Sequence, residues 1–263
     1  MPHTDVNHWA EDDCAKAVWD QHLLPPYQEL LADTLRGLDP RPGERWLDLG
    51  CGGGQLSAAL WRLSHGTLAE IVALDCAAIN AEQIDRLRAR LQPRPGNDQL
   101  HFVTGNFSAG LPKFADNTFD GIVSGLAISY AEHWDESVQR YTDAGYDNLL
   151  AEIHRVLKPG GRVIFSVNVP DPRWGRIFLK SLGQGFRVSK PFRFLVNGLR
   201  MMRYGRWLKR EARRGRFHYL PLPEIVARLD RLGFEGLKCR LSYAGQAYVI
   251  QAWRFAEPAR LVA

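Results

Sequence analysis

The sequence lacks the features that mark membrane-spanning, secreted and metal-binding proteins. No apolar run reaches the ~18–20 residues that a bilayer-spanning helix needs. The four cysteines form no C-x-x-C pair, so we expect free thiols in a reducing cytoplasm, and with no second ligand pair beside His3 and His8 we expect no metal site. Residues 1–13 are polar and acidic, which is not the pattern of a secretory signal. These absences leave a cytoplasmic globular protein, and 263 residues suffice for one α/β domain with an insertion.

The charge is distributed unevenly, although the overall net charge is only +5. Residues 171–218 hold fourteen Lys and Arg against two acidic residues, a net of +12, while the rest of the chain holds 20 basic and 27 acidic residues, a net of −7. This asymmetry carries information about partners and none about the fold.

The remainder of the chain is organised around one stretch, Trp46–Gln55. Apolar residues at 46, 47 and 49 predict a buried strand, glycines at 50, 52, 53 and 54 predict a turn, and residues 55–64 are compatible with a helix. A glycine turn lets backbone approach a ligand closely because no Cβ intervenes.

Strand and helix patterns alternate after this turn. We expect strands at 46–49, 68–74, 100–103, 119–125 and 162–167, a closing antiparallel hairpin at 237–243 and 247–255, and helices at 10–37 (broken at Pro25 and Pro26), 55–64, 77–91, 146–157 and 223–232. Such alternation implies parallel pairing with right-handed crossovers, so the ligand should lie beyond the carboxyl ends of the strands. The predicted fold is α/β, a Rossmann-like seven-stranded mixed sheet with helices on both faces.

The order of these motifs resembles the class I S-adenosylmethionine-dependent methyltransferases. Residues 48–54 match that family's D-x-G-x-G-x-G motif, Asp75 matches the acidic residue after the second strand, and residues 157–161 match its L-K-P-G-G turn. The resemblance covers about residues 43–168 and 220–255. It implies a cytoplasmic methyltransferase that uses S-adenosyl-L-methionine to methylate a small molecule.

The resemblance also implies a set of cofactor-binding residues. Glycines of the turn would approach the methionine part, Asp48 would orient the turn or accept from the ammonium, Asp75 would accept both ribose hydroxyls, and Asn106 and Phe107 would hold the adenine. The full predicted set is Asp48, Gly50, Cys51, Gly52, Gly54, Asp75, Cys76, Asn106, Phe107, Ser124 and Gly125, in which the two cysteines act as small fillers. A nicotinamide dinucleotide would also suit Asp75, but the G-x-G-x-G spacing, the preceding Asp and the Lys-Pro-Gly-Gly turn do not fit that class.

Residues 126–134 lie where the acceptor meets the methyl group in this family. They lack the Asn/Asp-Pro-Pro-Tyr signature of enzymes that methylate exocyclic amino groups of bases, which favours oxygen or carbon as the methylated atom. Tyr130 and His133 are the candidate proton acceptors, and a histidine that merely faces water is the competing interpretation of His133. Trp19, Tyr27, Trp134 and Trp174 are the candidate acceptor-binding residues.

The basic segment, residues 171–218, also carries many aromatic residues. Residues 192–214 can form a cationic amphipathic helix, with Phe192, Leu195, Leu199 and Met202 on its apolar side. Three interpretations stay open: a lid that docks on an anionic membrane over a lipid-like acceptor, a grip on nucleic acid such as RNA (the less favoured partner), or a cap over a soluble acceptor. A protein that binds the cofactor without catalysis is a further alternative. We divide the chain into an N-terminal helical cap (1–42), the cofactor-binding core (43–170), the basic aromatic lid (171–219) and the completion of the core (220–263).

Overall fold

A seven-stranded sheet forms the centre of the protein, whose structure is a computed structural model that describes residues 7–19, 24–91, 99–185 and 203–256. Its strand order is β3-β2-β1-β4-β7-β9-β8. All neighbours pair in parallel except β9, which runs antiparallel to both β7 and β8. In chain order the strands are β1 (Arg45–Leu49), β2 (Glu70–Asp75), β3 (Leu100–Thr104), β4 (Phe119–Gly125), β7 (Leu157–Asn168), β8 (Phe234–Ser242) and β9 (Ala247–Arg254). The predicted mixed Rossmann-like sheet with its closing hairpin is therefore confirmed.

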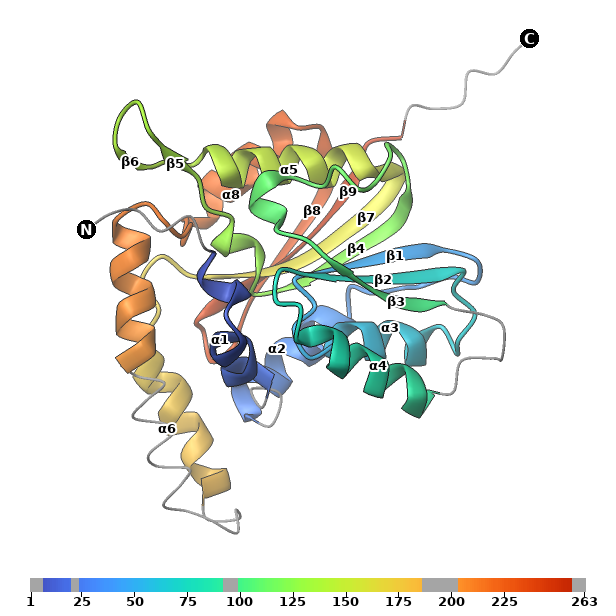
Figure 1. Ribbon diagram of the computed structural model, residues 1–263, viewed down its shortest axis with the longest axis horizontal. Coiled ribbons are helices and arrows are strands. Elements are labelled where there is room, and N and C mark those ends of the chain that lie inside the picture. Colours follow the sequence, from blue (N-terminus) through green and yellow to red (C-terminus); the bar gives the residue numbers. More distant parts are fainter. Residues whose placement is uncertain (1–6, 20–23, 92–98, 186–202, 257–263) are drawn as a thin grey trace.

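Helices cover both faces of the sheet (Figure 1). One core cluster joins the sheet to α2 (Pro25–Leu35), α3 (Gln55–Leu63) and α4 (Asn80–Leu91), and a second joins it to α5 (Ala144–Val156) and α8 (Leu222–Arg231). Because both faces are covered, four successive residues of β1, from Trp46 to Leu49, are all buried, which is why this strand reads as a continuous apolar run rather than an alternation.

The segments on either side of β4 contain short elements that were not predicted. The single-turn helix η3 (Phe107–Ala109) lies before β4. After β4 come η4 (Ile128–Tyr130) and a two-stranded antiparallel sheet of β5 (Trp134–Asp135) and β6 (Arg140–Tyr141). Elements this short leave no periodicity in a sequence, so pattern analysis does not find them.

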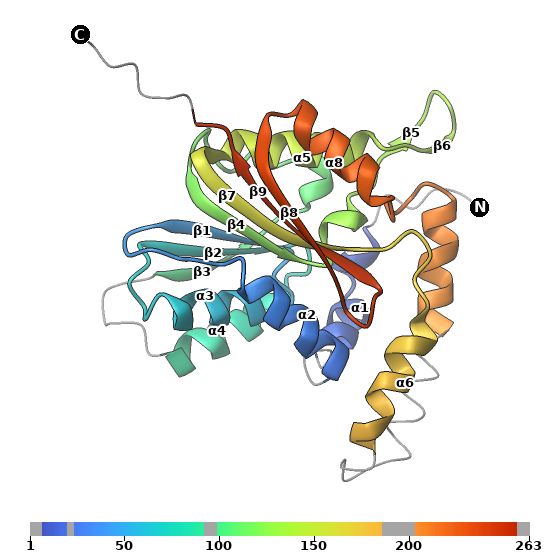
Figure 2. The same cartoon turned by 180° about the vertical axis from the view of Figure 1, so that it is seen from behind.

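The start of the cap and two helices of the lid lie side by side, next to the carboxyl ends of the parallel strands. The cap contains η1 (His8–Ala10) and α1 (Asp12–Val18), and the lid contains α6 (Trp174–Gly185) and a helix over residues 203–213. Figures 1 and 2 both show α6 and the 203–213 helix standing as a column next to this edge of the sheet. The part of the predicted 192–214 helix that precedes residue 203, with Phe192, Leu195, Leu199 and Met202, lies outside the described residues.

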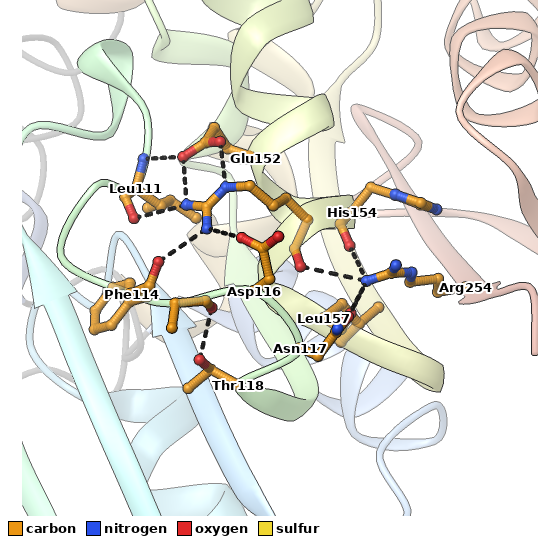
Figure 3. A network of polar contacts seen from close by, with 11 residues as sticks. Leu111, Phe114, Asp116, Asn117, Thr118, Glu152, His154, Leu157 and Arg254 are labelled. Atoms are coloured by element: carbon orange, nitrogen blue, oxygen red, sulfur yellow. Dashed lines mark hydrogen bonds and ion pairs between the residues drawn. The ribbon is translucent and has the colours of Figure 1, made fainter.

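A polar network closes the opposite edge of the sheet, where β4 and β7 begin (Figure 3). The Arg155 guanidinium donates to the carbonyl oxygens of Leu111 (3.1 Å) and Phe114 (3.0 Å) and to the carboxylates of Glu152 and Asp116. Arg254 of β9 donates to Asn117 Oδ1 (2.6 Å) and to main-chain carbonyls at the end of α5. The loop before β4 is thus fixed at the edge opposite to the carboxyl ends of the parallel strands.

Candidate functional site

A large cavity opens at the carboxyl ends of the parallel strands. Its volume is about 1210 Å³, a figure that includes its open mouth. Its walls come from the glycine turn, the ends of β2, β4 and β7, the cap, the lid and the β8–β9 turn. The lining residues are Asn7, Trp9, Ala15, Trp19, Tyr27, Gly50, Cys51, Gly52, Gly53, Gln55, Asp75, Cys76, Asn80, Phe107, Gly125, Leu126, Ala127, Tyr130, Asn168, Trp174, Tyr204, Gly205, Leu208 and Tyr243.

The glycine turn lies against this cavity in a conformation that only glycine adopts easily. Gly50, Gly52 and Gly54 have φ values of +73°, +48° and +77°. A Cβ on Gly50 would lie 2.3 Å from the Cβ of Ala127, so no side chain fits there. The Gly50 and Cys51 amides donate to the Leu74 carbonyl (2.8 and 3.0 Å), which fixes the turn to the end of β2. Gly54 lies at the start of α3 and outside the cavity lining.

Asp48 lies behind the turn and supports it. Its side chain is 1% exposed, and its Oδ2 accepts hydrogen bonds from the Ser57 amide (2.9 Å) and hydroxyl (2.7 Å) in the first turn of α3. Its Oδ1 has no hydrogen-bond partner among the described residues. Burial raises the pKa of this carboxyl to about 7, against the effect of the Ser57 hydrogen bonds. Asp48 does not line the cavity, so the structure favours the orienting role over direct contact.

Asp75 does line the cavity, and it is bonded to the turn. Its Oδ2 accepts from the Gly52 amide (2.9 Å) and its Oδ1 from the Ala77 amide (3.0 Å). Burial raises the pKa of its carboxyl, and these hydrogen bonds oppose the rise. Asn80, which sequence analysis missed, is 2% exposed, hydrogen-bonds Asp75, and accepts from the Trp19 indole (2.7 Å). A chain of hydrogen bonds therefore runs from the cap to the glycine turn.

The other residues predicted after β3 and β4 divide into two groups. Phe107 and Gly125 line the cavity, as predicted. Asn106 does not line it: its Oδ1 accepts from Asn7 Nδ2 (3.1 Å) and from the Ser108 amide (3.0 Å). Ser124 is fully buried and donates to the Leu49 carbonyl (2.7 Å), so it joins β4 to β1.

Aromatic side chains line much of the rest of the cavity. The predicted residues Trp19, Tyr27, Tyr130 and Trp174 are among them, and the unpredicted ones are Trp9, Tyr204 and Tyr243. The rings contact one another: the Trp9 and Tyr130 centroids lie 4.6 Å apart, and those of Tyr27 and Tyr243 lie 6.4 Å apart in an edge-to-face pair. Such rings offer a large apolar surface with few polar groups.

Tyr130, one of these aromatic residues, is fixed by hydrogen bonds. Its hydroxyl is 3.0 Å from the Tyr219 hydroxyl and accepts from Asn168 Nδ2 at 3.3 Å. Burial raises the pKa of Tyr130 to about 12, so the hydroxyl keeps its proton at neutral pH. Tyr130 can therefore donate a hydrogen bond in the cavity, and it is a poor proton acceptor there.

Comparison with known proteins identifies the core of the chain. Residues 47–165 match the family model described as a methyltransferase domain. The chain is 36% identical over 138 residues to the malonyl-[acyl-carrier protein] O-methyltransferase of Methylococcus capsulatus, and 34% identical over 124 residues to the demethylmenaquinone methyltransferase of Symbiobacterium thermophilum. These matches cover 52% and 47% of this chain and 42% of each relative. The chain therefore spans less than half of the length of either relative.

Residues 47–165 form a methyltransferase domain. The fold is shared with solved structures at low sequence identity. A methyltransferase from Aquifex aeolicus described as SAM-dependent has a TM-score of 0.55 at 13% identity, and the match covers 93% of this chain and 98% of that one. A Haloferax volcanii complex of the Trm112 activator with a methyltransferase has a TM-score of 0.59 at 18% identity, covering 97% of this chain and 100% of that one.

The residues of the methyltransferase domain fit S-adenosyl-L-methionine. At Gly50 a Cβ has no room, so backbone can approach a ligand closely, and the Asp75 carboxylate at the cavity wall can accept from a hydroxyl-bearing group. Gly50, Gly52, Asp75 and Asn80 would hold the methionine and ribose parts, and Phe107 would lie against the adenine. We place this end of the cavity, the cofactor end, between β1 and β3.

His133 and Trp134 are not brought to the cavity of the methyltransferase domain. His133 is exposed and its carbonyl accepts from the Thr142 amide, next to the small β5–β6 sheet. Trp134 packs its ring edge-to-face on Tyr141, with centroids 5.1 Å apart. The chain turns outward after η4, and this was not visible in the sequence. Neither residue is proposed further as a catalytic or acceptor-binding group.

Three side chains of metal-ligand type lie close together in the cap. The candidate ligand atoms of His8, Glu11 and Cys14 are all within 4.8 Å of one another. His8 Nε2, however, hydrogen-bonds the Tyr204 hydroxyl at 2.7 Å, and the His8 ring lies 4.5 Å from that of Trp207. The group therefore joins the cap to the lid, and the expectation of no metal stays a prediction.

Proposed function

We propose that this chain transfers a methyl group from S-adenosyl-L-methionine to an oxygen or carbon atom of a small, lipid-like acceptor. One observation carries the proposal: the same cavity is lined both by the glycine turn with Asp75 and by a set of aromatic side chains. The bound cofactor supplies a methyl group on a sulfonium. The acceptor atom donates the electron pair of the new bond, and the sulfur keeps the pair of the broken bond, leaving a thioether.

The described residues promote this transfer by positioning and by excluding water. The part of the cavity wall that the structure describes contains no His, Lys, Arg or Glu side chain. Tyr130 stays protonated, and burial also raises the pKa of Cys51 and Cys76. An acceptor that needs a strong base is therefore disfavoured. The proposal is an acceptor whose oxygen or carbon is already nucleophilic, oriented by Tyr130 and the surrounding rings.

The lipid-like character of the acceptor is supported by the aromatic lining and by relatives. Rings of Trp9, Tyr27 and Trp174 give the cavity an apolar lining. Curated relatives are named for methylating a malonyl carrier protein, a demethylmenaquinone and, in Oryza sativa (32% identical over 135 residues), a methylenesterol. For this chain, an apolar acceptor with one reactive oxygen or carbon is the shared chemistry that we propose.

We also propose that the lid contacts an anionic membrane. Arg173, Arg176 and Lys180 are exposed around α6, and so is Leu179, at 65%. Exposed cations continue along the second lid helix at Arg203, Arg206, Arg210, Arg213 and Arg214. Cations with exposed apolar residues favour a position at the surface of an anionic bilayer. In the described part of the chain, no helix has the length and hydropathy to cross a membrane.

The test is to incubate the protein with methyl-labelled S-adenosyl-L-methionine and a fractionated extract. We expect label in the organic-solvent phase, with the Asp75→Ala variant as the control that loses cofactor binding. Label in RNA would support the nucleic-acid alternative instead. Cofactor binding with no label in any fraction would support a non-catalytic protein, and failure to bind the cofactor would overturn the proposal.

A further inference from the structure

A groove separate from the main cavity runs between α3 and α4. Its volume is about 900 Å³, a figure that includes its open side. The two helices cover the same face of the sheet (Figures 1 and 2), and they touch at Gly54, where a Cβ would lie 2.7 Å from Ile84 and 3.0 Å from Leu87. Trp19 and Gly53 line both this groove and the main cavity, so the two spaces are neighbours.

The two helices line the groove with the same succession of side chains: a glutamine, an apolar residue and an arginine. These are Gln55, Ala58 and Arg62 on α3 and Gln83, Leu87 and Arg90 on α4. Their spacing places each set on one stripe of its helix. Both helices connect neighbouring parallel strands, so they run in the same direction. The glutamines therefore lie at the end nearer to the glycine turn, and the arginines lie about 10 Å further along.

The two arginines of the groove have no anionic partner in the described part of the chain. Outside the lid, the arginines that the structure describes bond to a carboxylate or a main-chain carbonyl, except for Arg62, Arg90 and Arg140. Two of these three line one groove, and no described Asp or Glu lines it with them. The chain outside residues 171–218 has a net charge of −7, so a cationic groove there stands against its surroundings.

These side chains fit a phosphate group attached to a hydroxylated molecule. A guanidinium presents a planar fork of N–H donors that matches two phosphate oxygens, and two guanidinium groups balance a dianion. Each glutamine amide offers a donor and an acceptor, which suits hydroxyl groups. Between the two ends, Ala58 and Leu87 (each 3% exposed) form an apolar floor for the carbon skeleton of such a ligand.

We propose that the groove between α3 and α4 binds a small phosphate monoester, with the phosphate held by Arg62 and Arg90 and the hydroxyl groups by Gln55 and Gln83. This site goes beyond the proposed function, because it lies outside the cavity in which the methyl group is transferred. Its ligand would touch Trp19, whose indole donates to Asn80 (2.7 Å), and Asn80 hydrogen-bonds Asp75. The site is therefore linked to the cofactor end through described contacts.

The test titrates three probes by calorimetry, at low ionic strength, into the protein saturated with S-adenosylhomocysteine: inorganic phosphate, glycerol 3-phosphate and ribose 5-phosphate. We expect both esters to bind about fivefold or more tightly than inorganic phosphate, and Gln83→Leu to remove this gain. Arg62→Gln and Arg90→Gln should each weaken the binding of all three probes by about fivefold or more. Tighter binding of one ester would show whether a glycerol or a sugar carries the phosphate.

Arg140→Gln is the matched control, because Arg140 is also exposed and unpaired among the described residues but lies on β6, outside the groove. It should leave all three affinities unchanged, and thermal melting checks that each variant is folded. Equal losses in Arg140→Gln would overturn the proposal, since they would show a general attraction of anions to the protein. Equal affinity of the three probes, or binding of none of them, would overturn it as well, while methyl transfer would be unaffected.

Discussion

At the scale of single residues, Gly50 shows how little space the site leaves. Its φ of +73° and the 2.3 Å approach of a built Cβ to Ala127 both exclude a side chain. We expect Gly50→Ala to lower the affinity for S-adenosylhomocysteine by at least about a hundredfold, measured by calorimetry, because the turn must shift. Gly43→Ala is the control: its φ is +79°, but nothing lies within 4 Å of the added Cβ. It should lose about 1 kcal/mol of stability through strain and keep its affinity.

Asp48 predicts a dependence of stability on pH. Its folded-state pKa of about 7 is above the ~3.9 of an unfolded aspartate. The folded state therefore binds the proton more tightly, so the stabilisation from this carboxyl is complete below pH ~4 and is lost as pH rises through 7. Asp48→Asn stays neutral and can still accept from Ser57. Its melting temperature relative to wild type should rise from pH 5 to about 7 and level off above that in the ligand-free protein.

The control for this experiment is Asp230→Asn, at an exposed position of α8. A plot of its melting temperature against pH should run parallel to that of the wild type over the same pH range. Parallel curves for Asp48→Asn as well would contradict an elevated pKa at this carboxyl.

Sequence analysis identified residues that a local backbone feature, such as a turn or a strand end, requires. It missed residues whose role depends on neighbours that are distant in the sequence. The glycines and Asp75 were predicted because a turn and a strand end need those residues wherever they occur. Asn80 and Asn168 were missed because an asparagine in a helix or strand shows its role only through its neighbours in space. His133 was placed in the site because it follows β4, and the outward path of the chain after η4 was not predictable.

At the scale of elements, the cap is joined to the cofactor end through one indole. Trp19 donates to Asn80, which hydrogen-bonds Asp75. We expect Trp19→Phe, which keeps the ring and loses this donor, to speed dissociation of S-adenosylhomocysteine by about three- to tenfold in stopped-flow measurements. In a double-mutant cycle with Asn80→Ala the two effects should not add. Additive effects would show that the indole acts independently of Asn80.

The network around Arg155 should matter for stability and not for ligand binding. Its guanidinium bonds two carbonyls and two carboxylates at the edge remote from the cavity (Figure 3). Arg155→Met should lower the free energy of unfolding by about 2 kcal/mol in urea titrations, with unchanged S-adenosylhomocysteine affinity. Arg86→Met, which removes an exposed i,i+4 pair with Glu82, should cost about 0.5 kcal/mol or less. Equal losses would contradict a special role for Arg155.

Helices and strands were predictable where buried apolar residues recur at a regular spacing along the chain. The seven main strands and the helices of the core agree with the expected ranges to within a few residues at most of their ends, because each buries a continuous or periodic apolar face. The strand β7 starts at Leu157 rather than at residue 162, because Leu157 already pairs with Phe119 of β4. The register between the two strands then shifts across the Lys-Pro-Gly-Gly stretch. The two-residue strands β5 and β6 bury too few apolar side chains to leave such a pattern.

At the scale of the whole molecule, the uneven charge predicts that the protein binds anionic membranes. We expect it to pellet with vesicles of mixed phosphatidylcholine and phosphatidylserine at low salt and to be released as salt is raised. Reversal of Arg173, Arg176 and Arg206 to Glu should abolish pelleting. Reversal of Arg41, Arg86 and Arg231, three exposed cations outside the lid, should not. Equal behaviour of the two triple variants would contradict docking through the lid, and salt-sensitive retention on RNA instead would favour a nucleic-acid partner.

The division of the cavity between the sheet and the peripheral segments has an evolutionary consequence. The cofactor end is built on strands β1, β2 and β4, where a change would disturb the core. The Trp9, Trp174 and Tyr204 rings come from η1 and the lid, and they pack in a third, smaller cluster. Mutations can therefore accumulate in these outer segments at small cost to folding. A lineage with this architecture can change the acceptor it uses while it inherits its methyl donor intact, and laboratory evolution of new acceptors should target the same two segments.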